Sequence, residues 1–159
     1  MRKTRRAFTL IELLIYMMVL PTLLYILLQI FDSVLDVQME SLTSSSLQQD
    51  AGFILSRLEY DVHRADSITA PAAPGLTSGS LGLVINSVGQ TFSYSGGNLY
   101  LDSEVLNSSD VIVSGFSVTR IGNNTGQDTV QISMELTGSS IGFNGQTQSR
   151  SYQTTFGLR

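Results

Sequence analysis

Hydrophobic and polar positions divide the chain into three parts, and the first part is almost continuously apolar. It runs from Ala7 to Phe31 and contains a single charged residue, Glu12. A run of about 20 apolar residues is long enough to cross the hydrocarbon core of a membrane as a helix. The pattern therefore predicts a membrane-spanning helix over residues 8–31. Pro21 is predicted to kink this helix, because proline removes one of its backbone hydrogen bonds.

Residues 32–67 mix polar and apolar side chains at the spacing of an amphipathic helix. The apolar residues recur at steps of three and four, namely Leu47, Ala51, Ile54, Leu58, Val62 and Ala65. Such a stripe is typical of a helix that buries one face. The serine-rich stretch Ser41 to Ser46 could interrupt the helix, with Ser46 and Gln49 forming the capping box of a second one. A helix that is continuous or only bent is the preferred prediction.

Residues 80–159 show the alternation and the turn residues of β-strands, after a linker with proline and glycine at residues 68–79. The expected strands are residues 81–85, 91–94, 99–101, 111–113, 116–121, 129–137 and 149–158, with a hairpin turn at Gly96-Gly97-Asn98. Their apolar face can cover the helix stripe, which otherwise has no partner. The predicted fold class is α+β, with a long N-terminal helix packed on a C-terminal antiparallel β-sheet domain.

The composition is better suited to a secreted β-rich domain than to a cytosolic enzyme. Hydrophobic residues make up 42% of the chain, charged residues make up 14%, and cysteine is absent, whereas about a quarter of a soluble domain is usually charged. A chain cut after Ala7 would keep five basic and thirteen acidic residues, a formal net charge of −8 (5 − 13). Such an acidic domain lacks the cations that bind phosphates nonspecifically, so no nucleic-acid partner is expected.

Candidate catalytic and metal-binding residues are few. The chain has no Gly-x-Ser-x-Gly elbow, phosphate-binding glycine loop or zinc-ligand spacing. His63 is the single histidine, and an exposed place on the polar helix face is preferred over a metal site. Asn123, Asn124 and Asp128 carry oxygen ligands, but their spacing indicates a turn rather than an EF-hand calcium loop. Asn107 and Asn123 begin N-glycosylation patterns that we also interpret as turns. We expect no enzyme activity, no cofactor and no metal site.

The basic residues ahead of the apolar run predict its orientation. Arg2, Lys3, Arg5 and Arg6 should remain on the cytoplasmic side of the membrane, which places the rest of the chain outside. A cleaved signal peptide has the same order of features. The length of the apolar run, and the absence of a clear small-x-small site after it, argue against that alternative.

The residues from Ala7 to Ile15, AFTLIELLI, closely resemble the start of type IV pilins and of type II secretion pseudopilins. The resemblance implies that a prepilin peptidase cuts the Ala7–Phe8 bond and removes the leader at residues 1–7. It also implies that Phe8 becomes the methylated first residue. Two departures from the family pattern are present. The residue before the cut is usually glycine, and many major pilins carry their proline about two turns later than Pro21.

The place of Glu12 in the apolar run requires an explanation. An ionised carboxylate is costly in hydrocarbon unless it is paired or becomes protonated. Cleavage would create a cation at the same depth, the α-amine of Phe8, four residues away on the same helix face. In the resembled family, this glutamate attracts the N-terminal amine of the neighbouring subunit during filament assembly. The alternative is that Glu12 reaches the membrane interface from the helix end.

Residues 48–68, which include Leu55-Ser56-Arg57-Leu58-Glu59, resemble the same region of minor pseudopilins of the J type and minor pilins of the W type. The resemblance implies a structural subunit of a bacterial type IV pilus, a competence pilus or a secretion pseudopilus. Its partners would be other pilins or pseudopilins, the prepilin peptidase and the assembly platform of the inner membrane. The chain would be a single-pass protein of that membrane, with its N-terminus inside and its C-terminal domain extracytoplasmic, before it enters a filament. The alternative is a membrane-anchored extracytoplasmic binding module that does not assemble; an anchored enzyme is least favoured.

Overall fold

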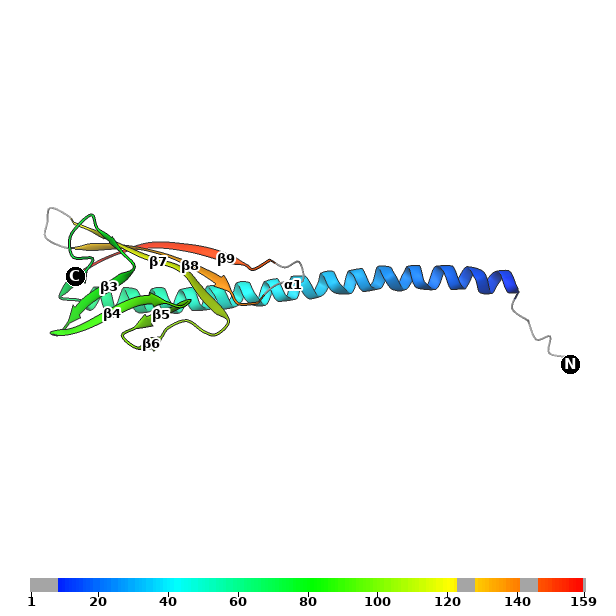
Figure 1. Ribbon diagram of the computed structural model, residues 1–159, viewed down its shortest axis with the longest axis horizontal. Coiled ribbons are helices and arrows are strands. Elements are labelled where there is room, and N and C mark those ends of the chain that lie inside the picture. The colour runs from blue at the N-terminus through cyan, green and yellow to red at the C-terminus, as the bar shows by residue number, and fades with distance from the viewer. Residues whose placement is uncertain (1–8, 123–127, 141–145, 159) are drawn as a thin grey trace. The chain divides into compact units, whose positions relative to one another are not determined.

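The structure is a computed structural model that describes residues 9–122, 128–140 and 146–158. One helix, α1 (Leu10–Arg64), occupies the first part of the described chain, and the elements after it are β-strands (Figure 1). The chain divides into two compact units, Met1–Gln38 and Met39–Arg159, and α1 contributes residues to both. The predicted α+β class and the long apolar N-terminal helix are confirmed.

Helix α1 is continuous over its 55 residues, including the serine-rich stretch. The prediction of a single helix is therefore confirmed, and no second helix starts at Ser46. Contacts with the strands hold this stretch in place. The hydroxyl of Ser44 accepts a hydrogen bond from Arg150 Nη2 at 2.8 Å. The methyl group of Thr43 occupies space that a side chain at Gly138 would need. Tertiary contacts thus override the low helix preference of serine.

The second unit contains two antiparallel sheets. The order of the first sheet is β1-β3-β4-β5-β6, formed by β1 (Ser67–Ala70), β3 (Ser80–Ile85), β4 (Val88–Ser95), β5 (Asn98–Leu101) and β6 (Glu104–Val105). The order of the second is β2-β7-β8-β9, formed by β2 (Thr77–Ser78), β7 (Val111–Ile121), β8 (Thr129–Gly138) and β9 (Ser149–Gly157). A hydrogen bond from the Val113 N–H to the Gly97 carbonyl (2.8 Å) joins the two sheets.

The core of the second unit lies between the sheets and the C-terminal half of α1 (Figure 1). All six residues of the predicted helix stripe are buried. On the sheet side, the alternate residues of β8 are buried as predicted, namely Val130, Ile132, Met134 and Leu136. The two periodicities of the sequence, near 3.6 and 2, therefore meet at one interface.

The strands differ from the prediction where they are short or irregular. Helix α1 ends at Arg64, and β1 begins at Ser67, the last residue of the predicted helix segment. The rest of β1 and all of β2 lie in the predicted linker, and the two strands pair with the longer strands β3 and β7. The two strands expected between residues 111 and 121 are one strand, β7, whose register shifts between Val113 and Gly115. A bulge inserts one residue and disturbs the alternation of side chains. This irregularity explains why the pattern reads as two strands.

Two polar residues of α1, Asp61 and His63, are not exposed to solvent as polar-face residues would be. Asp61 is 1% exposed, and its Oδ2 accepts a hydrogen bond from Arg57 Nε at 2.8 Å, one helical turn earlier. His63 is half-buried, with its ring edge-on to Phe156 and the two ring centroids 6.4 Å apart. The prediction of an exposed His63 was wrong, because a residue of β9 lies against it.

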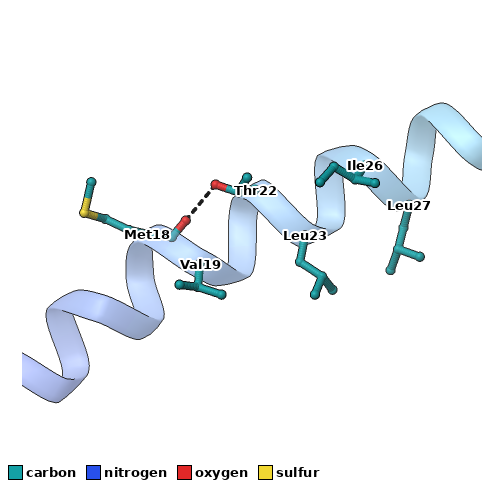
Figure 2. Close-up of a pocket in the computed structure, with 6 residues that line it drawn as sticks. All are labelled: Met18, Val19, Thr22, Leu23, Ile26 and Leu27. Atoms are coloured by element: carbon teal, nitrogen blue, oxygen red, sulfur yellow. Dashed lines mark hydrogen bonds between the residues drawn. The ribbon is translucent and has the colours of Figure 1, made fainter.

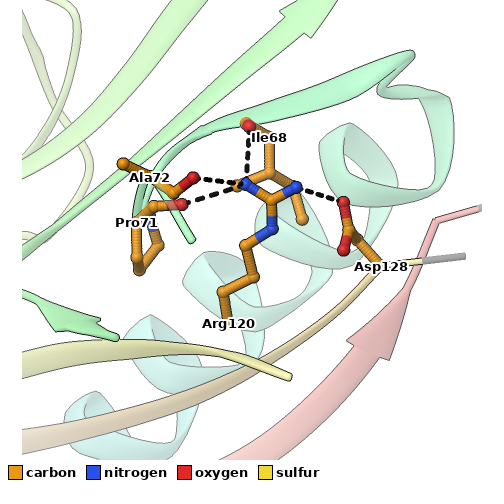
Figure 3. A network of polar contacts seen from close by, with 5 residues as sticks. All are labelled: Ile68, Pro71, Ala72, Arg120 and Asp128. Atoms are coloured by element: carbon orange, nitrogen blue, oxygen red, sulfur yellow. Dashed lines mark hydrogen bonds and ion pairs between the residues drawn. The ribbon is translucent and has the colours of Figure 1, made fainter. Parts of the chain in front are cut away.

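The side chain of Arg120 in β7 fixes the segment between β1 and β2 (Figure 3). Its Nη1 donates to the carbonyls of Ile68, Pro71 and Ala72 at 3.1, 3.2 and 3.3 Å. Its Nη2 donates to the carboxylate of Asp128. Charge-assisted hydrogen bonds of this kind are stronger than neutral ones. The segment that composition marks as a linker is thus anchored to the second sheet.

Candidate functional site

Ala7 and Phe8, the predicted cleavage and methylation residues, lie outside the described residues. Within the described chain, α1 begins at Leu10, and Glu12 lies in its first turn. The first turn of a helix carries unpaired N–H groups and a partial positive charge, which favour a carboxylate. The structure therefore places Glu12 where its charge is stabilised even before any partner is considered.

Thr9 is the N-cap of α1, a role that the sequence analysis did not assign. Its carbonyl accepts hydrogen bonds from the N–H groups of Glu12 (3.1 Å) and Leu13 (3.2 Å), and its Oγ1 lies 3.4 Å from the Glu12 nitrogen. Threonine followed three residues later by glutamate is the sequence of a capping box, so the signal was present in the sequence. The backbone N–H of Glu12 bonds to Thr9 and its carboxylate lies in the first turn. A test of an assembly role must therefore distinguish loss of pairing from a local change at the helix start.

The apolar half of α1 exposes its side chains within this chain. Met18 is 75% exposed and Leu27 is 55% exposed, and no residue of the most apolar window is buried. Figure 2 shows two rows of side chains on different sides of the helix, Val19, Leu23 and Leu27 in one and Met18, Thr22 and Ile26 in the other. The helix is long and apolar enough to cross a membrane. A helix that is apolar on all sides also suits packing against other apolar helices.

Pro21 lies inside α1, and the helix continues through it. Because proline has no N–H, the carbonyl of Met17 cannot receive its usual hydrogen bond. Thr22 donates its hydroxyl to the carbonyl of Met18 at 2.9 Å, an interaction that tends to bend helices. Both features weaken the same turn. The kink at Pro21 stays a prediction.

A second exposed feature of α1 lies on the side of the helix that faces away from the core. Phe53 and Tyr60, seven residues apart, are 57% and 54% exposed. The Arg64 guanidinium lies 4.9 Å from the centroid of the Tyr60 ring, and its Nη1 donates to the Tyr60 hydroxyl at 2.8 Å. Aromatic and arginine side chains are enriched at protein interfaces. These residues lie opposite the predicted apolar stripe, and no motif in the sequence marks them as an interface.

The residues considered for metal binding have other contacts where the structure describes them. Asp128 accepts from Arg120, and Asp66, three residues after His63, accepts from the Asn86 N–H at 2.8 Å. Asn123 and Asn124 lie outside the described residues. In the described part of the chain, no three histidine, cysteine, aspartate or glutamate side chains gather in a group that could hold a metal ion.

Asn107, which begins a glycosylation pattern, is 7% exposed and connects neighbouring backbone segments. Its Oδ1 accepts from the Leu99 N–H at 2.9 Å, and its Nδ2 donates to the Val111 carbonyl at 2.7 Å. Nδ2 also donates to Asn98 Oδ1 at 3.0 Å. The residue follows β6 as a turn residue would, but its side chain is a buried structural contact.

Comparisons with protein-family models, with curated proteins and with solved structures found no match to this chain. The observations that bear on function are therefore those of the chain itself. They are the first-turn glutamate, the exposed apolar helix, and the packing of the C-terminal half of that helix on antiparallel sheets, which is a pilin-like architecture.

Proposed function

We propose that this chain is a minor pilin or pseudopilin, a structural subunit of a type IV pilus-like filament. The observation that carries the proposal is Glu12, a carboxylate in the first turn of the apolar and exposed N-terminal half of α1. A membrane anchor alone needs no such charge, and its cost in hydrocarbon selects against it. A filament subunit uses the charge once cleavage creates an amine at Phe8.

The mechanism has two stages. Before assembly, the apolar half of α1 holds the chain in the inner membrane, with the basic leader on the cytoplasmic side. After prepilin peptidase cuts the Ala7–Phe8 bond and Phe8 is methylated, the amine keeps its positive charge and pairs with Glu12 of a neighbouring subunit. The apolar side chains that faced lipid then pack against other helices of the filament.

The packing of the second unit supports separate roles for the two halves of α1. Its buried apolar residues all lie at or beyond Leu47 among the described residues, so the core does not use the apolar half of α1. The exposed apolar side chains of α1 before that core can therefore contact lipid or other subunits without unfolding the domain. In this proposal the extracytoplasmic domain and the assembly segment are carried by one helix but have separate contacts.

The experiment replaces Glu12 and measures how much subunit enters filaments in cells that assemble them. The variant Glu12→Gln keeps the shape and the capping ability of the side chain but removes its charge. We expect filament incorporation to fall to background while membrane insertion and folding of the domain persist. Loss of one member of a buried ion pair costs about 3–5 kcal/mol, which is enough to abolish assembly.

The matched control is Glu40→Gln, a change of the same chemistry at an exposed position of α1 beyond the apolar run. It should leave incorporation unchanged. If Glu12→Gln assembled as well as Glu40→Gln, the charge of Glu12 would have no role in assembly and the proposal would lose its main support. A membrane-anchored module that does not assemble would show no filament incorporation for any variant, including the unaltered chain.

A further inference from the structure

Strand β9 is the one long strand at the end of a sheet among the described strands. Of the three other terminal strands, β2 and β6 have two residues each and β1 has four residues followed by Pro71. Strand β9 has nine residues and ends the order β2-β7-β8-β9. Natural proteins usually keep edge strands short, charged, bulged or interrupted by proline, because a free edge recruits another strand.

The register of β8 and β9 shows which backbone groups of β9 point outward. Hydrogen bonds from Leu158 N–H to the Asp128 carbonyl (3.0 Å) and from Gly138 N–H to the Gln148 carbonyl (2.8 Å) flank the ladder. Bonded and non-bonded pairs alternate in an antiparallel ladder, so the even-numbered residues of β9 bond β8. The odd-numbered residues direct N–H and C=O away from the sheet, namely Ser149, Ser151, Gln153, Thr155 and Gly157.

Strand β9 lacks the devices that protect other edges. It contains no proline, and its register with β8 is regular, whereas β1 with β3 and β7 with β8 show irregularities. Its single charged residue, Arg150, donates to Ser44 of α1. The side chains of the odd-numbered residues before Gly157 are exposed and uncharged. The edge is therefore open to an extended backbone and has no charge that selects a charged partner.

We infer that the edge of β9 pairs with β9 of a second copy of this chain, antiparallel and centred on Gln153. This register places Gln153 opposite Gln153 of the second copy, and Ser151 opposite Thr155 of the second copy. Every outward N–H then meets an outward carbonyl, because odd-numbered residues face odd-numbered residues. Arg150 falls opposite Phe156 of the second copy, so no like charges face each other. A two-fold axis through the centre makes the contact self-complementary.

The direction of β9 determines how the two paired domains are oriented relative to each other. Arg150 contacts Ser44 and Phe156 contacts His63, so β9 runs in the same direction as the part of α1 beside it. Antiparallel pairing therefore turns the two domain helices in opposite directions. It does not rest on the proposed filament role.

Cysteine crosslinking of the full chain in detergent tests the pairing, because the natural sequence has no cysteine. Residues opposite each other in a sheet are close enough for a disulfide. With a mild oxidant, Gln153→Cys should crosslink to itself. Ser151→Cys should crosslink to Thr155→Cys in a mixture and much less to itself. Ser133→Cys, the neighbour of Gln153 on β8, is the control and should not crosslink.

Charge substitutions give a second test that does not depend on cysteine at the centre. In the Ser151→Cys and Thr155→Cys mixture, adding Gln153→Lys to both partners, or Gln153→Glu to both, places like charges face to face. Crosslinking should fall about fivefold in each case. Lys in one partner and Glu in the other should restore it. Circular dichroism of each variant checks that the domain is folded.

Two results would overturn the inference. Equal self-crosslinking of Ser151→Cys and Gln153→Cys would indicate a parallel contact or random collision. Absence of crosslinks at all three β9 positions, from a folded chain at high concentration, would show that a second copy does not occupy the edge. Binding of an unrelated extended peptide to that monomeric chain would then assign the edge to another partner.

Discussion

Arg120 and Asp128 form an ion pair that ties β7 to the start of β8, while the same guanidinium bonds three carbonyls of the segment after β1. The Arg120 side chain is 16% exposed and the Asp128 side chain is 25% exposed. A partly desolvated pair with several additional hydrogen bonds contributes more than an exposed pair. The pairing turns a proline- and glycine-containing connection into a fixed part of the domain.

Replacing Arg120 by alanine should destabilise the domain by about 3 kcal/mol, because three carbonyls and one carboxylate lose a charged donor. Urea unfolding of residues 39–159, which carry the buried core, measures the effect. Arg150→Ala is the matched control, since Arg150 is exposed and its hydrogen bond within the described residues goes to Ser44. It should change the free energy of unfolding by less than about 0.5 kcal/mol. Equal effects would show that the Arg120 contacts add nothing.

The part of α1 that packs on the sheets should tolerate substitution on its exposed side but not in the buried stripe. Leu58 is fully buried in the core, whereas Phe53, one and a half turns earlier, is 57% exposed. Leu58→Ala should cost about 2–5 kcal/mol through the lost burial and the cavity left behind. Phe53→Ala should cost less than about 1 kcal/mol. Thermal unfolding of the two variants checks this order, and a larger loss for Phe53→Ala would contradict the packing.

Asn107 should matter for stability rather than for glycosylation. Asn107→Ala leaves the Leu99 N–H and the Val111 carbonyl without their side-chain partner, and a buried unsatisfied group costs about 1–3 kcal/mol. Ser109→Ala removes the same glycosylation pattern at an exposed position and should leave stability unchanged. Denaturant unfolding of both variants separates the two roles. If Ser109→Ala were as harmful as Asn107→Ala, the buried hydrogen bonds would not be the cause.

The cap at the start of α1 can be separated from the proposed assembly role. Thr9→Ala removes the capping hydroxyl and should cost about 1 kcal/mol of local helix stability, seen as faster amide exchange in the first turn. It leaves the charge of Glu12 in place, so filament incorporation should persist. If Thr9→Ala blocked incorporation as completely as Glu12→Gln, the helix start rather than the charge would control assembly.

Periodicity predicted the main elements because each repeats a local pattern several times. The six stripe residues, five in α1 and Ala65 directly after it, and the four alternating residues of β8 were identified by spacing alone, and all are buried in one core. The turn at Gly96 and Gly97 was predicted from composition, and both residues have positive φ angles (58° and 84°) that favour glycine.

The sequence did not reveal features that depend on partners distant in the chain. Strands β1 and β2 are too short to show a period and exist through their pairing with β3 and β7. Asp61 reads as a polar-face residue, but Arg57 and the surrounding packing allow its burial. The free edge of β9 follows from the strand order, which the sequence pattern does not fix. By contrast, the cap at Thr9 was present in the sequence as a capping box.

The central claim is that a peptidase of the pilin type releases a filament subunit at the Ala7–Phe8 bond. Mass spectrometry of the N-terminus of the mature protein, isolated from its native host, tests it most directly. The account predicts a chain that begins at Phe8 and carries one methyl group on its amine. A chain that retains Met1 and the basic leader, or one that begins beyond Phe31, would contradict it.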